Sequence, residues 1–206
     1  MNRSTPPPGR GVAPAACAPQ PADAALATVL AQSWALLAQG CADPTHGCHW
    51  PVLATVALDG SADARTVVLR AVDAATRVLA VHSDARAGKL AQLRANPQAC
   101  LVFHDAAART QLRVSGWVSI HAGDEAAAQA WAALRPQSQA LYEGFARFTL
   151  LSLRVQALDW LLLDPAGHRR ARFRWTTGKG ASDEDQHAAP DRHHDATAVE
   201  AAWIEP

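Results

Sequence analysis

The feature that most constrains the fold is a series of short, strand-like apolar segments that begins at residue 50. Each is bounded by turn or loop residues, and the first is followed by Asp59-Gly60, a strong hairpin signal. Consecutive strands joined in this way favour an antiparallel sheet over a doubly wound parallel one. The predicted strands are Trp50–Leu58, Arg65–Val72, Arg77–His82, Gln98–His104, Gln111–His121, Phe148–Asp164 and Arg169–Trp175.

Helical segments are few and flank or interrupt the strands. An amphipathic helix is predicted from Asp23, a plausible N-cap, to Gly40, a plausible C-terminal stop, because large apolar residues recur between them at helical spacing. Further helices are predicted at Ala85–Ala95, Asp124–Leu134 and Gln137–Phe145. The combination predicts an α+β, mainly β, domain of barrel type.

The chain divides into four parts by composition. Residues 1–21 are rich in Pro, Ala and Gly and are predicted to be disordered, because they cannot bury enough apolar surface to offset their ordering entropy. Residues 22–175 hold the folded domain. Residues 176–199 are polar and are predicted to form a mobile loop. Residues 200–206 are predicted to return to the barrel as a final short strand.

Composition excludes several classes of partner and location. The chain has 19 Lys and Arg against 19 Asp and Glu, so its zero net charge does not favour nucleic acid or an anionic membrane as partner. No stretch approaches the roughly 20 apolar residues of a membrane span, and the N-terminus lacks the apolar region of a signal peptide. The expected location is the cytoplasm. The basic run of residues 169–174 is one strand in a neutral chain, for which the phosphate of a small ligand is a simpler partner.

Cationic residues are placed where they could meet a ligand. Arg65 and Arg70 are five residues apart, which puts them on opposite faces of a regular strand unless a bulge or a turning end intervenes. Farther on, Arg86 and Lys89 lie in the first turns of a predicted helix. Cations normally avoid that end of a helix, so their position calls for an anion such as a phosphate. Gln111 can both donate and accept hydrogen bonds, as the edge of a flavin or pyrimidine-like ring requires.

The order and spacing of these residues resemble the pyridoxamine 5′-phosphate oxidase superfamily of FMN-binding split barrels. The resemblance covers about residues 50–120 well and persists more faintly to the C-terminus. It rests on the segments Ala54–Gly60, Arg65–Arg70, Ser83–Lys89, Asn96-Pro97 and Gln111–Gly116, and later on Arg135-Pro136 with Ser138, Trp160, Arg172-Phe173 and Trp203–Pro206. It implies a split β-barrel of antiparallel Greek-key type with peripheral helices.

The resemblance also implies a cofactor site. Arg65 and Lys89 would hold the FMN phosphate, and the backbone of Val67 and Val68 would run alongside the flavin ring. The full set of implied FMN-binding residues is Arg65, Thr66, Val67, Val68, Leu69, Arg70, His82, Ser83, Arg86, Lys89, Gln111, Trp160 and Arg172. The implied substrate residues are Arg70, Arg135, Ser138 and Arg169. In this family two subunits build each site, so a homodimer with FMN at the subunit interface is implied, and no catalytic residue is assigned.

Departures from the family pattern bear on the activity. The vitamin B6 oxidases have Lys where this chain has Arg70, and Ala87-Gly88-Lys89 stands where a Ser-Arg-Lys run often occurs. The segment after Arg135-Pro136 is shorter, and residues 168–172 are only a loose analogue of the substrate signature. We therefore expect an FMN-dependent oxidoreductase acting on a small substrate, phosphorylated or not. The alternatives are a non-catalytic flavin-binding or stress protein, a true pyridoxamine 5′-phosphate oxidase, and a deazaflavin or haem in place of FMN.

Metal binding is a competing hypothesis of a different class. Five potential ligands cluster after the first predicted helix, and three histidines lie near the C-terminus, but none has the usual spacing of a zinc site. The favoured interpretation is a loop that contains Cys and His, with no metal. The residues concerned are Cys41, Asp43, His46, Cys48, His49, His187, His193 and His194.

Overall fold

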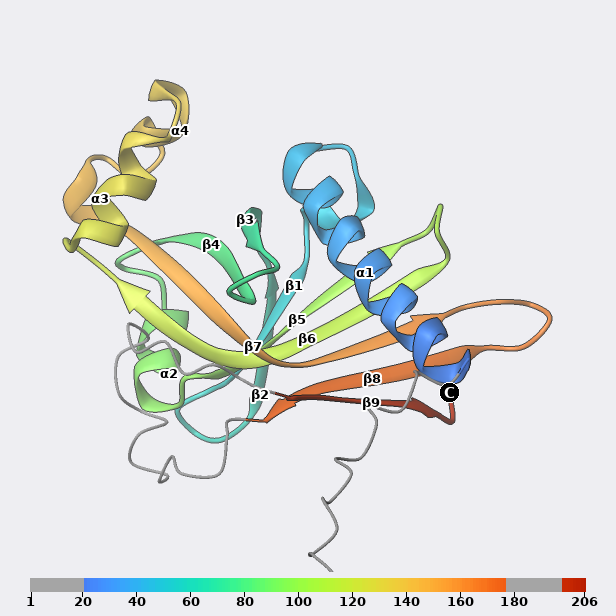
Figure 1. Ribbon diagram of the computed structural model, residues 1–206. Coiled ribbons are helices and arrows are strands. Elements are labelled where there is room, and N and C mark those ends of the chain that lie inside the picture. Colours follow the sequence, from blue (N-terminus) through green and yellow to red (C-terminus); the bar gives the residue numbers. More distant parts are fainter. Residues whose placement is uncertain (1–20, 177–197) are drawn as a thin grey trace, which may run out of the picture.

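The computed structural model describes residues 21–176 and 198–206, and Figure 1 shows them as one curved antiparallel sheet with helices around it. The two segments predicted to be disordered or mobile lie largely outside these residues. The strands are β1 (Val52–Val56), β2 (Ala62–Thr66), β3 (Leu69–Asp73), β4 (Val78–Asp84), β5 (Gln98–Asp105), β6 (Thr110–His121), β7 (Phe148–Leu162), β8 (Arg169–Thr176) and β9 (Ala198–Ile204).

The long strand β7 organises the sheet. It pairs with β6 along one edge, while on its other edge its first half pairs with β4 and its second half with β8. The strand order is β2-β1-β5-β6-β7-β4-β3, and β9 pairs with β8. Among the described residues no ladder joins β2 to β3, so the sheet curls without closing. The predicted class, α+β and mainly β with antiparallel strands, is confirmed.

The prediction of a single strand over Arg65–Val72 is wrong. Strand β2 ends at Thr66 and pairs with β1, whereas β3 begins at Leu69 and pairs with β4. The chain therefore crosses from one end of the sheet to the other through Val67 and Val68. The backbone N–H of Val67 donates to the carbonyl of Pro51 at 2.9 Å, which fixes the crossing. An apolar run without turn residues carries no local sign of this break.

Helix α1 (Pro21–Ala42) lies along the barrel beside β3, β8 and β9 (Figure 1). It extends past both predicted ends. Gly40 does not stop it; a Cβ at this position would lie 2.6 Å from the Cβ of Cys48. The glycine is thus required by the close approach of the short helix η1 (Gly47–His49).

The length and hydropathy of α1 would allow it to cross a membrane, contrary to the expectation that no stretch would. Its large apolar residues are used within the fold. Leu26, Val29 and Leu37 are buried in the barrel core, and Trp34 packs edge-on against Trp175 of β8. The opposite face carries mainly Ala, Gln and Thr. This arrangement is that of a core-packing helix.

The remaining helices are shorter than predicted. Helix α2 (Lys89–Ala95) begins four residues later than expected, because a turn around Asp84 precedes it. Helix α3 (Glu125–Ala132) is capped by Asp124, the first residue of the predicted helix, which accepts a hydrogen bond from Ala127 N. The last predicted helix is divided into α4 (Pro136–Ala140) and η2 (Phe145–Arg147).

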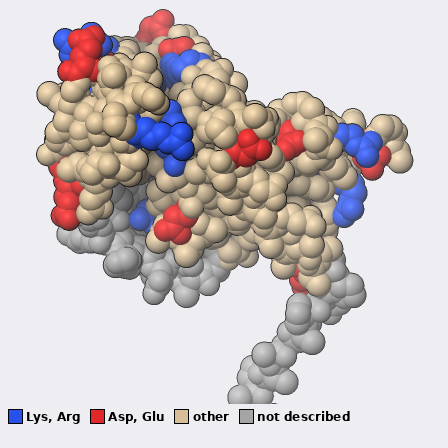
Figure 2. All heavy atoms as spheres, turned by 90° about the horizontal axis from the view of Figure 1, so that it is seen from above, with Lys and Arg blue, Asp and Glu red and all other residues tan. Residues whose placement is uncertain are grey.

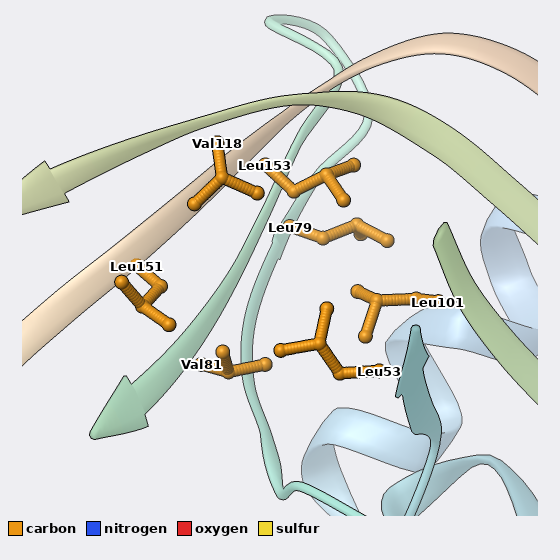
Figure 3. A pocket seen from close by; sticks show the side chains of 7 residues that line it. All are labelled: Leu53, Leu79, Val81, Leu101, Val118, Leu151 and Leu153. Atoms are coloured by element: carbon orange, nitrogen blue, oxygen red, sulfur yellow. The ribbon is translucent and has the colours of Figure 1, made fainter. Parts of the chain in front are cut away.

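The interior of the barrel is closed to ligands of flavin size. Figure 3 shows side chains from several strands pointing toward a central cavity of about 10 Å³, barely the volume of one water molecule. The cavity is lined only by aliphatic side chains, namely Leu53, Leu79, Val81, Leu101, Val118, Leu151 and Leu153. Any small-molecule site in the described residues must therefore lie on the outside or at an end of the barrel.

Candidate functional site

Arg65 occupies the end of the barrel that α2 covers. It lies opposite Leu53 in the β1–β2 ladder, so its side chain points to the inner face. Its guanidinium donates to Thr55 Oγ1 at 2.6 Å, to the Leu53 carbonyl at 3.4 Å and to Gln92 Oε1 at 3.0 Å. It also pairs with the Asp63 carboxylate at 2.5 Å. The strand register and one residue of α2 together determine where this charge lies.

Lys89, the first residue of α2, is the second cation at this end. It is half-buried and forms no hydrogen bond or ion pair with any described residue. Burial lowers the pKa of Lys89, the positive charge of Arg65 lowers it further, and the Asp84 carboxylate partly opposes both effects. A half-buried cation beside another cation is stabilised by an anionic partner. The electrostatics of this end therefore fit a phosphate.

Arg86 does not require an anionic ligand. The sequence had suggested such a requirement, because Arg86 lies in the first turn of a predicted helix. Its guanidinium makes two hydrogen bonds to the Asp84 carboxylate, at 2.9 and 2.8 Å, and lies 3.6 Å from Glu143. These bonds hold the pKa of Asp84 well below its usual range. Ser83 is buried and donates its hydroxyl to the Asp84 carbonyl at 3.1 Å. The compensating anion for Arg86 is thus supplied by the protein.

The crossing segment between β2 and β3 lies next to this end. Val67 and Leu69 are buried, Val68 is half-buried and Thr66 is exposed. The backbone N–H of Val67 is already used by Pro51. The apolar side chains anchor the segment, and its outer surface is formed by Thr66, Val68 and the adjoining backbone.

Arg70 and His82 form a neighbouring group. Arg70 is exposed, and its charge acts on Cys41, His82 and Tyr142. The Nδ1 atom of His82 is buried without a hydrogen-bond partner, and its ring packs edge-on against Phe148 at 4.8 Å. Burial, and then the charge of Arg70, lowers the pKa of His82 to about 4. His82 is therefore neutral near pH 7 and has an unused nitrogen.

Two predicted substrate residues, Arg135 and Ser138, lie in and before α4. Arg135 is exposed at the N-cap of that helix, and Ser138 is half-buried. Within the described residues neither forms a hydrogen bond or ion pair with Arg70. Helix α3 packs over β7, where Trp131 of α3 forms an aromatic cluster with Tyr142, Phe145 and Phe148.

Arg172 and Gln111 lie elsewhere, on the outer face of the sheet. Arg172 alternates with the buried Phe173 in β8, and Gln111 alternates with the buried Leu112 in β6. Arg65 faces inward and lies at the far end of the strand order, so one chain cannot place all three residues on one small ligand. The structure divides the predicted cofactor residues between two surfaces.

A carboxylate that the sequence analysis did not identify neutralises this outer face. Asp159 of β7 accepts two hydrogen bonds from Arg170, both at 2.8 Å, and two from Arg172, at 2.9 and 3.2 Å. A hollow of about 480 Å³ opens beside it, lined in part by Arg113, Arg174 and Gln156. Cross-strand pairing of Asp159 with Arg172 is the signal that could have identified this cluster.

Trp160 and Arg169 serve the packing of the C-terminal strands. Trp160 is only 8% exposed and belongs to the barrel core, with its ring edge-on to Trp203 at 6.2 Å. The Arg169 guanidinium stacks over the ring of Trp203 at 4.6 Å. Among the described residues neither forms a hydrogen bond or ion pair with Arg65 or Lys89. Within one chain Trp160 is a core residue, and its role at the cofactor stays a prediction.

The Cys/His loop brings His46, Cys48 and Asp105 together, with their ligand atoms within 4.8 Å of one another. The backbone N–H of Cys48 donates to His46 Nδ1 at 3.1 Å, and His46 Nε2 lies 3.0 Å from Asp105. Both ring nitrogens are thus committed to hydrogen bonds. Burial raises the pKa of Cys48 to about 12, which keeps its thiol protonated. These bonds favour a structural role that joins η1 to β5. The three C-terminal histidines of the metal hypothesis lie outside the described residues.

The charges on the visible surface are mixed. Figure 2 shows blue and red residues interspersed among uncharged ones, with no extended region of one sign on the face in view. Among the described residues in this view, there is no basic stripe of the kind typical of nucleic-acid-binding proteins.

Comparison with known proteins identifies the relatives of this chain. A profile of the pyridoxamine 5′-phosphate oxidase family matches residues 41–163, more than half of the chain. The pyridoxine/pyridoxamine 5′-phosphate oxidase of Xanthomonas campestris pv. campestris (strain 8004) is 36% identical over 107 residues, which are 45% of this chain and 53% of that protein. The chain thus matches about half the length of this relative.

Solved structures agree on the fold. A pyridoxamine 5′-phosphate oxidase-related, FMN binding protein from Nostoc punctiforme PCC 73102 has a TM-score of 0.64 at 19% identity, covering 91% of this chain and 98% of that one. PhzG from Burkholderia lata 383, solved with tetrahydrophenazine-1-carboxylic acid, has a TM-score of 0.56 at 15% identity, covering 87% and 92% of the two chains. At these identities the likeness establishes the split-barrel fold.

Proposed function

Because the chain belongs to the pyridoxamine 5′-phosphate oxidase family, we propose that it binds FMN and is an FMN-dependent oxidoreductase acting on a small substrate, phosphorylated or not. The observation that carries this proposal is Lys89, a half-buried cation beside Arg65 that has no anionic partner among the described residues. A phosphate supplies the missing negative charge at the end of the barrel where the family resemblance expects the FMN phosphate.

The residues at the α2 end of the barrel would mainly bind the cofactor and the substrate. Lys89 and Arg65 would hold the phosphate, and the crossing segment at Val67 and Val68 would lie along the flavin ring. The bound FMN would supply the redox chemistry as acceptor or donor of a hydride. Neutral His82 can donate or accept a hydrogen bond through its unused Nδ1. Exposed Arg70 would attract an anionic group of the substrate.

A homodimer is part of the same proposal. Gln111 and Arg172 face outward and cannot join Arg65 within one chain, so a second copy would have to bring them to the cofactor. A row of exposed apolar side chains on and beside β1 supports such pairing, because apolar surface of this kind marks protein interfaces. These residues are Trp50, Val52, Val56 and Leu58.

The test is a comparison of FMN with riboflavin, which lacks the phosphate. We expect the purified protein to bind FMN, as shown by flavin absorption and fluorescence quenching. Lys89→Gln should weaken FMN binding by about thirtyfold, a value typical of losing one partly buried charge contact, and leave riboflavin binding unchanged. Arg94→Gln, at an exposed cation of the same helix, is the matched control and should have no effect.

The outcomes separate the alternatives. A protein that binds no flavin contradicts the proposal outright. Equal loss of FMN and riboflavin affinity in the Lys89 variant would show that this residue supports the fold rather than the phosphate. Tight FMN binding without reduction by a nicotinamide or oxidation of pyridoxamine 5′-phosphate would favour the non-catalytic flavin-binding alternative.

A further inference from the structure

Arg65 is committed to partners within the protein. A guanidinium has five N–H donors. Its NH1 group donates to Thr55 Oγ1 and to the Leu53 carbonyl, and its NH2 group is shared between Gln92 Oε1 and the Asp63 carboxylate. Once the bonds within the described part of the chain are counted, the Nε donor alone is left for a further ligand. A phosphate that takes two bonds from Arg65 must therefore displace one of these partners.

Asp63 is the partner that a phosphate would most directly replace. It lies two residues before Arg65 in β2, so both side chains are on one face of the strand. Its Oδ2 atom accepts from Arg65 NH2 and also from Gln92 Nε2 at 2.7 Å. The Thr55 hydroxyl donates to Gln92 Oε1 at 2.7 Å and thereby fixes the amide. Of the groups that bind Arg65, the carboxylate alone is an anion.

The charges at this end are therefore unevenly matched. The carboxylates that act on the two cations are Asp63, which holds Arg65, and Asp84, which is engaged by Arg86 and acts on Lys89 only at longer range. The hydrogen bond from Gln92 is the largest influence that lowers the pKa of Asp63, so its carboxylate stays ionised near neutral pH. A phosphate at Lys89 would meet this negative charge and would compete with it for Arg65.

We propose that Asp63 is a positioning residue that competes with the cofactor phosphate for Arg65. It holds the guanidinium toward α2 together with Gln92, and it reduces the preference of the site for a phosphorylated flavin over an unphosphorylated one. This inference rests on the proposed function, because it assumes that the phosphate of FMN lies beside Arg65 and Lys89.

The test replaces the carboxylate by an amide of the same size. In Asp63→Asn we expect the dissociation constant of FMN to fall about tenfold, because one nearby unit charge no longer repels the phosphate and no longer occupies Arg65. The dissociation constant of riboflavin should not change. Asp59→Asn is the matched control: it removes one charge from the turn of the same hairpin, where the carboxylate bonds only to Ser61.

The direction of the change distinguishes competition from a structural role. If Asp63 only supported the fold, Asp63→Asn would weaken FMN binding or leave it equal to that of Asp59→Asn, and either result would overturn the inference. The gain should shrink in an Arg65→Gln background, because the part that comes from competition for that guanidinium is then lost and only the relief of charge repulsion remains. If the unaltered protein binds no FMN, the proposed function fails first, and this outcome is distinct from normal FMN binding with no gain in the variant.

Discussion

The α2 end of the barrel and the outer face of β8 both carry arginines that resemble cofactor ligands, but their charges are balanced differently. On the outer face, Asp159 receives four hydrogen bonds from Arg170 and Arg172. At the α2 end, Asp63 holds Arg65 and Asp84 holds Arg86, while Lys89 has no partner among the residues that the structure describes. The comparison teaches that the unpaired charge, rather than the number of cations, indicates where an anion is needed.

The largest expected effect comes from removing the carboxylate of the outer face. Asp159→Asn should lower the free energy of unfolding by about 2 kcal/mol, because it leaves two arginines without their anion. This loss of stability is smaller than that expected for breaking a fully buried ion pair, because both guanidinium groups reach solvent. Urea unfolding measures the change, with the exposed Glu200→Gln on the adjoining strand as control. If the urea midpoint of Asp159→Asn were unchanged, Asp159 would not stabilise the outer face, and the difference in charge balance between the two regions would have no energetic consequence.

A pH experiment extends the comparison to Arg70 and His82. The pKa of His82 is lowered to about 4 from about 6.5 in the unfolded chain. In this window the unfolded state binds the proton and the folded state does not, so stability is full above pH 6.5 and falls as pH drops toward 4. Because the ring is not fully buried, we expect the loss to reach only about 1–2 kcal/mol.

The variant His82→Asn isolates this contribution from those of the other histidines. Urea unfolding at pH 7 and at pH 5 should show a smaller loss of stability in the variant than in the unaltered protein. Arg70→Gln should also reduce the pH dependence, because the charge of Arg70 contributes to the lowered pKa of His82. Identical pH profiles for all three proteins would contradict a neutral, strongly perturbed His82.

The smallest expected effect is a gain in stability rather than a loss. Lys89→Met should raise the free energy of unfolding by about 0.5–1 kcal/mol, because it replaces a half-buried cation, unpartnered within residues 21–176 and 198–206, with an apolar side chain of similar length. Inorganic phosphate should raise the melting temperature of the unaltered protein and leave that of this variant unchanged. Destabilisation by Lys89→Met would show that the cation already has a stabilising partner, and would remove the main support for the phosphate site.

Several features were predictable because they depend on neighbours in the chain. The hairpin at Asp59-Gly60 follows from a glycine with a positive φ of 85° at the turn, and the Asp124 cap follows from one carboxylate next to a helix start. The proximity of Arg65 and Lys89 was expected from the family resemblance alone. It agrees with the structure, in which the charge of Arg65 lowers the pKa of Lys89.

Other features depended on contacts between distant segments and were missed. Gly40 was interpreted as a helix stop, whereas it permits contact with Cys48. The packing of Trp160 against Trp203 of β9 was another of them, while the place of Trp160 at the cofactor stays a prediction. Asp63 lies two residues before Arg65 in β2, and the hydrogen bonds that both make to Gln92 of α2 depend on a contact between distant segments.

The amino-acid sequence by itself determined the antiparallel, mainly β class, the main turns and the family, because periodicity, turn residues and motif spacing are local properties of the chain. Only the tertiary structure decided that Val67 and Val68 cross between the ends of the sheet, which cations are neutralised, and which predicted ligands share a surface. The physical reason is that charge balance and strand register depend on residues far apart in the chain, whose partners are set by the packing of the whole barrel.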